Sequence, residues 1–362
     1  MTAEPVTSPR GLASPLRPLV VGDLVEGQPI AGFAWVAPPE DDRYLSTHVD
    51  DRLLFDGDEE LDAPPDRPVP QTAEYAVPAG VVPPEEPELV RAADTIDGLL
   101  PLRFDALLDL PDAPWRPVIR PLVAAVYATG HRLWLAGGAV RDVLAGRPLH
   151  EVNDLDLAGT VPPGRFSDIA RQVLRVAQMS ECRTQVSADS LVCSIKSRRA
   201  NVRLLEYRGL TRAGFRFPAV GSALGEDARN RDFSFNALMY DIVDRLVYDG
   251  SGRGVEDLLG GSVRFRPLRV TDDPFVQAEV VLRGMKFAYR WRNGTALDLA
   301  GYREWIAELP DAFWCGFTRT QRASLASLRQ QYIPDLAWAA EFATTLPRPG
   351  NDFVTSLVGG TR

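Results

Sequence analysis

The chain has 362 residues, of which 45% are hydrophobic and 25% charged, and its formal net charge is −9 at pH 7. This length suits about two domains with a sizeable core. No apolar run approaches the roughly 18 residues of a membrane helix, and the N-terminus lacks the pattern of a targeting signal, so we expect a cytoplasmic protein without membrane contact. Cys182, Cys193 and Cys315 have no short paired spacing, which argues against a disulfide framework and a zinc site.

Charge and proline are unevenly distributed along the chain. Residues 1–110 contain 22 acids against 7 arginines, a balance of −15, and 16 of the 30 prolines. We expect an acidic, proline-rich and partly flexible region there, in which Leu19–Val25 and Ile30–Val36 could form a hairpin. Residues 111–300 contain 27 Lys or Arg against 21 acids, a balance of +6. This suits a polyanion such as triphosphate or RNA, although a solvated surface could have the same composition.

From about residue 114 the apolar spacing predicts a mixed domain. Its elements, in chain order, are helix 118–127, strand 132–136, helix 139–144, strand 154–158, helix 166–177 and two hairpin strands, 192–196 and 202–207. Helices 232–240 and 276–291 follow, separated by a glycine-rich stretch, and further helices are expected to about residue 341. We therefore expect an α+β protein with a mixed-sheet head, residues 111–262, followed by a helical neck and C-terminal part, residues 263–362.

Two carboxylates in the predicted strand 154–158 are the first candidate site. Asp154 and Asp156 stand at positions i and i+2, so both side chains lie on one face of the strand, about 6 to 7 Å apart. Close carboxylates repel each other, and a divalent cation relieves this repulsion while it accepts phosphate oxygens as further ligands. Taken alone, such a pair is more often two solvated acids at a strand edge.

A glycine turn precedes this strand by fewer than twenty residues. Gly137 and Gly138 stand at the start of a helix, where backbone N–H groups and the positive helix end favour a bound anion. Arg141 follows one turn later and could reach a triphosphate. A glycine pair by itself is usually an ordinary turn, but this spacing allows a phosphate cradle and the pair Asp154 and Asp156 to share one end of a sheet.

Four sequence motifs follow one another between residues 135 and 288. They are Leu135-Ala-Gly-Gly-Ala-Val-Arg-Asp142 with Asn153-Asp-Leu-Asp-Leu-Ala158, then Glu226-Asp-Ala-Arg-Asn-Arg-Asp-Phe-Ser-Phe-Asn-Ala-Leu238, then Tyr248-Asp-Gly-Ser-Gly-Arg-Gly-Val-Glu-Asp-Leu258, and last Leu282-Arg-Gly-Met-Lys-Phe-Ala288. Together they resemble the class II tRNA nucleotidyltransferases and bacterial poly(A) polymerases, in which the third motif is a flexible hinge and the fourth begins the neck. The resemblance covers residues 115–291 and implies a polymerase-beta-like nucleotidyltransferase head.

The resemblance also implies an activity and a set of site residues. A nucleoside monophosphate would pass from an NTP, ATP or CTP, to an acceptor hydroxyl, in the first place an RNA or tRNA 3′ end, with release of pyrophosphate. Asp154 and Asp156 would be the catalytic residues and would hold Mg²⁺, with two ions serving the displacement. Further residues would hold the nucleotide: Gly137, Gly138, Arg141, Asp142, Arg231, Asp232, Asn236, Asp273 and Gln277. For Arg231 and Asp232 the alternative is an ion pair that caps a helix.

One departure from the family concerns the metal site. The family carries an acid five residues before the Arg of a Phe-Arg pair, and the corresponding residue, counted back from Tyr207-Arg208, is Arg203. Glu206 is the nearest acid, but strand alternation sets it on the opposite face from Arg203. The two aspartates then act without a third carboxylate, or Glu206 substitutes for it through a shifted register.

A second departure concerns the choice of base. The family's neck reads Glu-Asp-x-x-Arg, whose Asp and Arg pair with the edge of the incoming base, and the counterparts of that Arg are Val280, counted from Arg283, or Val276, counted from Asp272-Asp273. About one helical turn is inserted between the two reference points. Gln277 could read a base edge instead, because its amide both donates and accepts. The preferred base therefore stays open.

Two further functions remain possible on the sequence. About 70 residues follow the neck helix, so we expect a shortened C-terminal part that grips a whole tRNA only with help from a partner or a second copy. This leaves nucleotidyl transfer to a small molecule or a protein hydroxyl as an alternative. A non-catalytic nucleotide- or RNA-binding module is the third possibility, against which the intact Asp154 and Asp156 argue. The oligomeric state stays open.

Overall fold

The structure, a computed structural model, describes residues 89–152, 154–187, 192–197, 202–210, 224–269 and 271–359. The hairpin expected within residues 19–36 lies outside these ranges. Among the described helices, none is both long and apolar enough to cross a membrane.

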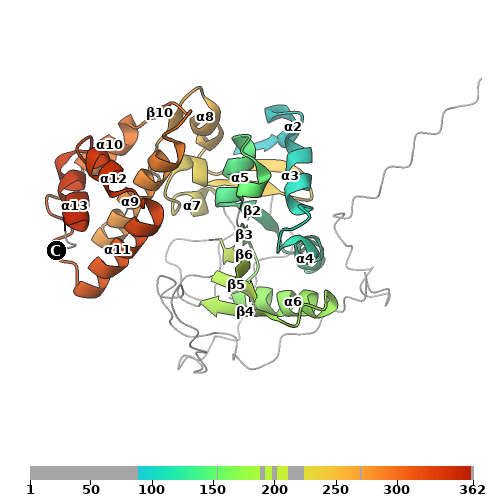
Figure 1. Cartoon of the computed structure of the whole chain (residues 1–362). Coiled ribbons are helices and arrows are strands. Elements are labelled where there is room, and N and C mark those ends of the chain that lie inside the picture. Colours follow the sequence, from blue (N-terminus) through green and yellow to red (C-terminus); the bar gives the residue numbers. More distant parts are fainter. Residues whose placement is uncertain are drawn as a thin grey trace, which may run out of the picture.

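An eight-stranded mixed sheet lies at the centre of the first half of the described chain (Figure 1). In spatial order its strands are β1 (Val90–Ala92), β8 (Leu246–Asp249), β7 (Leu238–Asp241), β2 (Leu133–Ala136), β3 (Leu155–Gly159), β6 (Val202–Gly209), β5 (Val192–Ser197) and β4 (Cys182–Ser187). Strands β3 and β6 run parallel, and the other neighbouring pairs of this sheet run antiparallel. The sheet and its helices confirm the expected α+β class.

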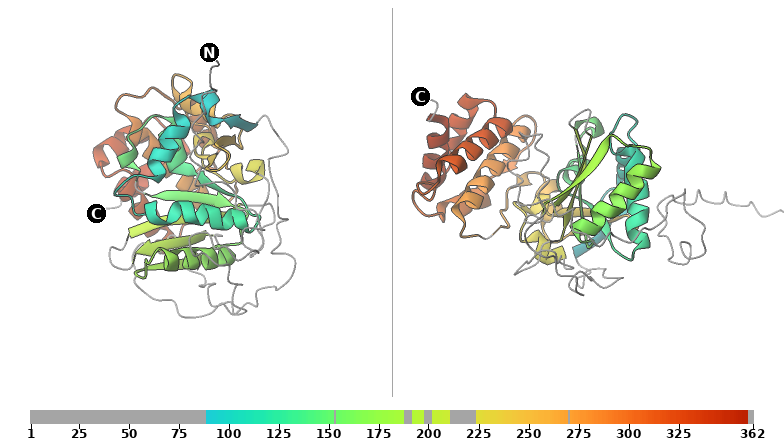
Figure 2. Two further views of the ribbon diagram at one scale, coloured as in Figure 1. Left: turned by 90° about the vertical axis from the view of Figure 1, so that its right-hand side faces the viewer. Right: turned by 90° about the horizontal axis from the view of Figure 1, so that it is seen from below.

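Helices cover one face of this sheet. They are α3 (Leu100–Leu108), α4 (Arg116–Ala128), α5 (Gly137–Leu144) and α6 (Pro163–Val176), joined by the short α2 (Ala93–Ile96) and η4 (Leu149–Glu151). Helices α4 and α6 lie side by side along the sheet (Figure 2). Leu155 and Leu157 of β3 belong to the core under these helices. Because side chains alternate along a strand, Asp156 between them points to the opposite face.

Apart from β7 and β8, the described chain from residue 224 on is mainly helical, as expected. It contains α7 (Leu224–Ala228), α8 (Gly254–Leu259), α9 (Pro274–Trp291), α10 (Ala300–Ala307), α11 (Arg319–Tyr332), α12 (Leu336–Ala343) and α13 (Arg348–Gly359), with a small parallel pair of β9 (Val263–Arg264) and β10 (Leu297–Asp298). Helices α9 to α13 form a group to one side of the sheet (Figures 1 and 2). The long neck helix α9 begins at Pro274, where Asp273 caps it by accepting the N–H of Phe275.

An aromatic cluster joins the sheet to the neck helix. It consists of Phe233, Phe235, Phe265, Phe287, Trp291 and Tyr302, whose ring centres lie 5.2 to 6.2 Å apart in successive contacts. Tyr302 approaches the backbone of α9 and donates its hydroxyl to the carbonyl of Val281 at 2.6 Å. A Cβ on Gly284 would lie 2.4 Å from the Tyr302 ring. The glycine of the fourth motif therefore makes room for this ring.

Most of the predicted elements are confirmed, but the helix predicted over 232–240 is wrong. The segment contains a short 3₁₀ turn, η5 (Ser234–Asn236), and then the strand β7. Strand β7 lies in the middle of the sheet, between β8 and β2, and its four residues are all buried. A strand covered on both faces has a continuous apolar run, which spacing alone does not distinguish from a buried helix.

The segment before residue 110 contributes to the sheet. Strand β1 pairs with β8, and Phe104 of α3 stacks on Tyr240 of β7 with ring centres 3.7 Å apart. These elements lie within the region predicted to be acidic and partly flexible, whose end was expected at residue 110. The predicted boundaries at residues 110 and 262 stay a prediction.

Candidate nucleotide site

The turn from β2 into α5 brings backbone close to a carboxylate. Gly137 has φ +63°, a left-handed conformation that glycine adopts without strain, and it starts helix α5 directly after Ala136 ends β2. A Cβ at Gly137 would lie 3.2 Å from Oδ2 of Asp156. The predicted glycine turn and the predicted carboxylate strand therefore meet at one end of the sheet, on the face that α4 and α6 leave uncovered.

Carboxylates from two neighbouring strands gather at this point. Asp156 of β3 pairs in register with Glu206 of the parallel strand β6, so their side chains share a face. Desolvation and the charges of Glu206 and Asp154 together raise the pKa of Asp156 to about 7, against the opposing effect of Arg203 and Arg231. A partly buried carboxylate beside two others is the arrangement that a divalent cation relieves.

The expectation that Glu206 and Arg203 lie on opposite faces is wrong. The register between β5 and β6 shifts at Ile195, so that Leu204 is an extra residue on β6, and both Leu204 and Leu205 are buried. This bulge breaks the alternation, and Glu206 forms an ion pair with Arg203. The register of β6 with β3 sets Glu206 beside Asp156, and its role as a third carboxylate of the metal site stays a prediction.

A second set of predicted residues forms a closed hydrogen-bond network. Nη1 of Arg141 donates to Oδ1 of Asn236 at 2.6 Å, and Nε of Arg141 donates to Oδ1 of Asp142 at 3.0 Å. The amide of Asn236 donates to both oxygens of Asp232, at 3.0 and 3.1 Å. Arg141 and Asp142 are only 3% and 5% exposed, so their polar groups face other protein groups.

Two arginines of the neck helix close this network. Nη1 of Arg283 donates to Oδ2 of Asp232 at 2.8 Å, and Nη2 of Arg290 donates to Oδ2 of Asp142, also at 2.8 Å. Burial alone would raise the pKa of Asp232, but Arg283 and the amide of Asn236 bring it below its usual value. The head and α9 are therefore joined by two matched carboxylate–guanidinium pairs.

Further cations gather on the same side of the site. Arg231 bonds to Asp227 through Nε at 2.9 Å, and Arg208 lies in register with Ala158, on the face that Asp156 shares. Burial and the charges of the neighbouring Arg231, Arg269 and Arg283 together lower the pKa of Arg208 to about 10. Cations that lower one another's pKa favour a bound polyanion.

Lys286 adds another cation from the neck helix, and it is one of two lysines in the chain. Its Nζ lies 4.5 Å from the centre of the Tyr332 ring of α11. Burial and the charges of Arg283 and Arg141 together lower the pKa of Lys286 to about 8. The C-terminal helices therefore contribute a side chain to the edge of the site.

The start of the neck differs from the predicted base-reading site. Asp273 caps α9, and Nε2 of Gln277 donates to the carbonyl of Thr271 at 2.8 Å. Gln277 is 9% exposed and Val280 is 2% exposed. The proposed contact between Gln277 and a base edge stays a prediction. One N–H of the Gln277 amide already donates to the carbonyl of Thr271.

Residues 133–264 match the protein family described as the poly(A) polymerase head domain. The match contains the glycine turn, both aspartates of the carboxylate strand and the network around Asp232. It ends at β9, before the neck helix begins.

Two curated relatives match the head domain and its surroundings. The chain is 27% identical over 191 residues to poly(A) polymerase I of Escherichia coli O6:H1, which covers 51% of this chain and 40% of the relative. It is 27% identical over 173 residues to the CCA-adding enzyme of Streptococcus pyogenes serotype M2, covering 46% of this chain and 39% of that enzyme. The matches thus span about two fifths of the length of these relatives.

Solved structures with similar coordinates are CCA-adding enzymes. A complex of such an enzyme with CTP aligns with a TM-score of 0.49 and 16% identity, over 71% of this chain and 54% of that chain. The Thermotoga maritima CCA-adding enzyme in complex with tRNA aligns with a TM-score of 0.41 and 16% identity, over 69% and 54%.

The predicted residues fall into two groups around the head domain. Gly137, Asp156 and Arg231 line the carboxylate side of the site, whereas Arg141, Asp142, Asp232 and Asn236 form the network toward the neck. Sequence reasoning did not single out Arg208, Arg269 and Lys286, whose charges lie near these two groups. The signal was present in part, since Arg208 follows Glu206 by two residues and Lys286 stands in the fourth motif.

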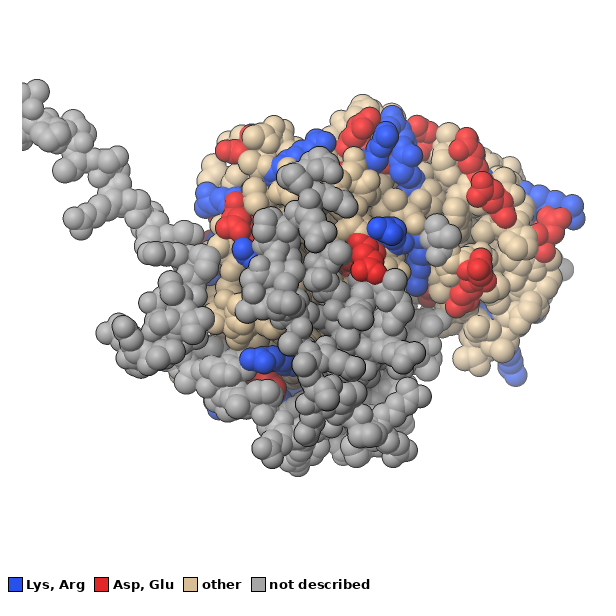
Figure 3. All heavy atoms as spheres, turned by 180° about the vertical axis from the view of Figure 1, so that it is seen from behind, with Lys and Arg blue, Asp and Glu red and all other residues tan. Residues whose placement is uncertain are grey.

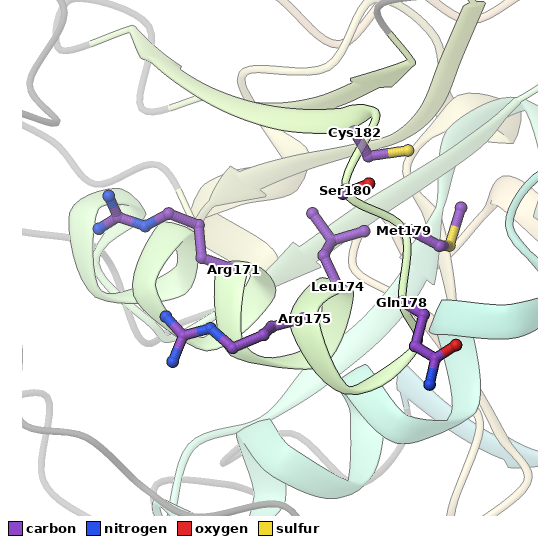
Figure 4. A pocket seen from close by; sticks show the side chains of 7 residues that line it. All are labelled: Arg171, Leu174, Arg175, Gln178, Met179, Ser180 and Cys182. Carbon is purple, nitrogen blue, oxygen red and sulfur yellow. The ribbon is translucent and has the colours of Figure 1, made fainter.

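Two other surfaces of the molecule differ from this site. A pocket at the C-terminal end of α6 is lined by Arg171, Leu174, Arg175, Gln178, Met179, Ser180 and Cys182, none of which belongs to the predicted nucleotide site (Figure 4). On the face drawn in Figure 3, basic and acidic side chains of the described residues are interspersed.

Proposed function

We propose that this chain is a metal-dependent nucleotidyltransferase that moves a nucleoside monophosphate from an NTP to the 3′ hydroxyl of an RNA. The observation that carries the proposal is the position of Asp156. Its Oδ2 lies against the left-handed Gly137 that starts α5, beside Glu206 and Asp154, with the arginine cluster on the same face. The poly(A) polymerase head domain and the activities named for its relatives support the same reaction.

The side chains at the carboxylate strand suit Mg²⁺. Carboxylate oxygens are its preferred protein ligands, and Asp154 and Asp156 would hold it. Among the described residues, no three acidic, histidine or cysteine side chains form a metal-binding group by themselves, so phosphate oxygens of the nucleotide would complete the ligand set. Glu206 would not ligate the ion directly, because its carboxylate is paired with Arg203. When bound, Mg²⁺ would stabilise the negative charge that develops on the phosphate oxygens.

The residues of the chain would bind and orient the two reactants. The acceptor hydroxyl oxygen forms a bond to the α-phosphorus, and the bond from that phosphorus to the pyrophosphate oxygen breaks. The N-terminal turn of α5 presents backbone N–H groups near Asp156, where negative charge is stabilised. Arg231 and Arg208, on the same face, would neutralise the departing pyrophosphate.

Incorporation of labelled nucleotides tests the proposal directly. The purified chain is incubated with Mg²⁺ and each of the four labelled NTPs, with total RNA and without RNA. We expect labelled RNA, and the NTP that supplies the label identifies the preferred base. Omitting Mg²⁺, or adding a chelator in excess, should abolish labelling. Without the cation, nothing offsets the repulsion between the carboxylates of Asp154 and Asp156 and the negative triphosphate.

A pair of double variants separates the site from general effects of charge. Asp154→Ala/Asp156→Ala should abolish labelling. Asp112→Ala/Asp311→Ala removes two exposed carboxylates elsewhere and should leave labelling unchanged. Labelling that survives the first variant would overturn the proposal. Pyrophosphate release without labelled RNA would instead identify a small molecule or a protein hydroxyl as the acceptor. If neither labelled RNA nor released pyrophosphate is found, the chain is a non-catalytic nucleotide- or RNA-binding module.

A further inference from the structure

Strands β4, β5 and β6 form one edge of the large sheet, and their side chains divide between its two faces (Figure 1). The hydroxyl of Thr184 on β4 lies 2.7 Å from that of Ser167 on α6, and Ile195 of β5 is buried in the core under the same helices. Because side chains alternate along a strand, Arg183 and Lys196 point to the opposite face, which α4 and α6 leave uncovered. This is also the face of the candidate site.

Three cations form a row across this edge of the sheet. Arg183 of β4 lies opposite Lys196 of β5, and Lys196 lies opposite Arg203 of β6. Nζ of Lys196 donates to Oε1 of Gln185 at 3.4 Å, and the side chains of the three cations are partly exposed. Like charges directly opposite each other on neighbouring strands destabilise a sheet. A bound polyanion would offset this repulsion.

The row of cations ends at the carboxylates of the candidate site. Arg203 forms an ion pair with Glu206, and Glu206 lies in register with Asp156 of β3. From β4 to β3 the sheet crosses three strand spacings, about 14 Å in all. Arg203 stands where the class II tRNA nucleotidyltransferases carry an acid, so the inner end of the row is a departure from that family.

The row and the glycine turn lie on opposite sides of the carboxylate strand. Strand β3, which carries Asp156, stands between β2, whose end leads into the turn at Gly137, and β6, which carries Arg203. In the reaction proposed above, the triphosphate lies at the turn, so the side of β6 is open to the acceptor. Cations at successive strands suit a chain that carries one negative charge at each phosphate.

We propose that the row of Arg183, Lys196 and Arg203 binds the backbone phosphates of the acceptor RNA next to its 3′ end. The strand then crosses β4, β5 and β6 before its 3′ hydroxyl reaches the carboxylates. The assignment rests on the function proposed above and names the acceptor as a single-stranded 3′ end. Contacts to phosphates carry no base information, so the row positions the strand without selecting its sequence.

Two double variants with the same change of charge test the row. Arg183→Ala/Lys196→Ala removes its two outer cations and leaves Arg203 beside the carboxylates. Arg116→Ala/Arg175→Ala removes two exposed arginines of α4 and α6, on the other face of the same sheet. Binding of a short single-stranded RNA with a 5′ fluorophore to the full chain is measured by fluorescence anisotropy without NTP. Thermal unfolding measures folding.

Arg183→Ala/Lys196→Ala should weaken RNA binding at low salt by about tenfold or more, the range of a charge-assisted contact. The slope of log K against log salt should become shallower by about 1.4, because each phosphate contact of a single strand contributes about 0.7. Arg116→Ala/Arg175→Ala should change binding by less than about threefold, because salt screens distant charges. Equal losses in the two variants, or no loss in the first, would overturn the assignment.

A variant of the same side-chain length guards against a loss of folding. If Arg183→Ala/Lys196→Ala does not fold, Arg183→Gln/Lys196→Gln takes its place, because glutamine keeps most of the length and removes the charge. The expected losses are the same. RNA binding that equals that of the wild-type chain would count against the row in this variant as well.

Neutral methylphosphonate linkages locate the contact on the RNA. Next to the 3′ end, they should weaken binding to the wild-type chain but not to Arg183→Ala/Lys196→Ala, because both changes remove the same contacts. Additive losses would contradict the assignment. A loss that depends on linkages at the 5′ end instead would place the strand in the reverse direction and would also overturn it.

Binding of inorganic tripolyphosphate with Mg²⁺ separates the row from the nucleotide. We expect it to be unchanged in Arg183→Ala/Lys196→Ala, and a loss parallel to that of RNA would assign the row to the triphosphate and overturn the proposal. None of these measurements needs turnover. RNA bound through the row but never labelled would refute the proposed function alone, whereas labelled RNA with unchanged binding in the variant would refute the row alone.

Discussion

The carboxylates on the two sides of the candidate site have opposite electrostatic surroundings. Asp156 is partly buried beside Glu206 and Asp154, and desolvation together with these like charges raises its pKa to about 7. Asp232 is buried and enclosed by Arg283 and the amide of Asn236, and its pKa lies below the usual range. Both aspartates belong to motifs of one head domain. Desolvation raises the pKa of both carboxylates, so the donors around Asp232 bring the two pKa values apart.

This difference separates residues that hold the fold from residues that keep a charge for chemistry. A carboxylate that is fully bonded stabilises the protein and has little left to offer a ligand. A carboxylate that is buried among like charges costs stability, and a bound cation or substrate recovers that cost. Variants on the two sides should consequently fail in different ways.

The largest expected effect is the loss of activity in Asp156→Asn. The amide keeps the shape of the side chain but removes the charge, so nucleotide incorporation should fall by about a thousandfold or more. The free energy of unfolding should stay unchanged or rise, because the substitution removes repulsion with Glu206 and Asp154. Labelling assays and urea unfolding measure the two quantities. An unfolding free energy that drops together with activity would show that Asp156 is structural.

Asp142→Asn should fail in the opposite way. It leaves the guanidinium of Arg141, which is 3% exposed, and that of Arg290 without their carboxylate, and a broken buried pair costs about 3 kcal/mol. Asp352→Asn is the control, because it breaks an exposed pair with Arg348 and should change the free energy of unfolding by less than about 0.5 kcal/mol. Similar values for the two variants would remove the contrast between the two sides of the site.

The sequence predicts the two sides of the site unequally, for a physical reason. The turn at Gly137 and the pair Asp154 and Asp156 lie in consecutive elements, so local periodicity places them at one end of a sheet. The pairs of Asp232 with Arg283 and of Asp142 with Arg290 join residues 51 and 148 positions apart. No local pattern encodes such contacts.

Two features of the sheet were also beyond local reasoning. Strand β7 is covered on both faces, so its apolar run was interpreted as a helix. The bulge at Leu204 depends on how β6 pairs with β5, and the register of β6 with β3 sets Glu206 beside Asp156. In both cases the tertiary neighbours, rather than the residues themselves, determine the outcome.

His131 is a third buried titratable group, and its hydrogen-bond partner is an uncharged hydroxyl. His131 is 9% exposed and its Nδ1 lies 3.1 Å from the hydroxyl of Thr160, while burial and the charge of Arg165 lower its pKa to about 4. Its folded pKa lies below the unfolded value of 6.5, so its contribution to stability is complete above pH 6.5 and is lost as the pH falls toward 4. The loss should reach about 3 kcal/mol.

The free energies of unfolding of the wild-type chain and His131→Gln should therefore be compared between pH 7.5 and pH 4. Carboxylates titrate in both proteins, so the difference between the two curves isolates His131. We expect the variant to lose about 3 kcal/mol less than the wild type over this interval. Parallel curves would mean that the imidazole finds a counter-charge when it is protonated.

The smallest expected change in stability is that of Gly137→Ala, and it tests the contact between the turn and Asp156. A left-handed φ of +63° costs an alanine about 1 to 2 kcal/mol. Gly261→Ala is the matched control, because Gly261 has φ +83° and a Cβ there would meet nothing within 4 Å. Both variants should lose similar stability, but the Cβ at Gly137 would press on Oδ2 of Asp156 from 3.2 Å. Incorporation should consequently fall by about 10- to 100-fold in Gly137→Ala and stay unchanged in Gly261→Ala. Equal activity in the two variants would mean that the turn supports the fold without shaping the site.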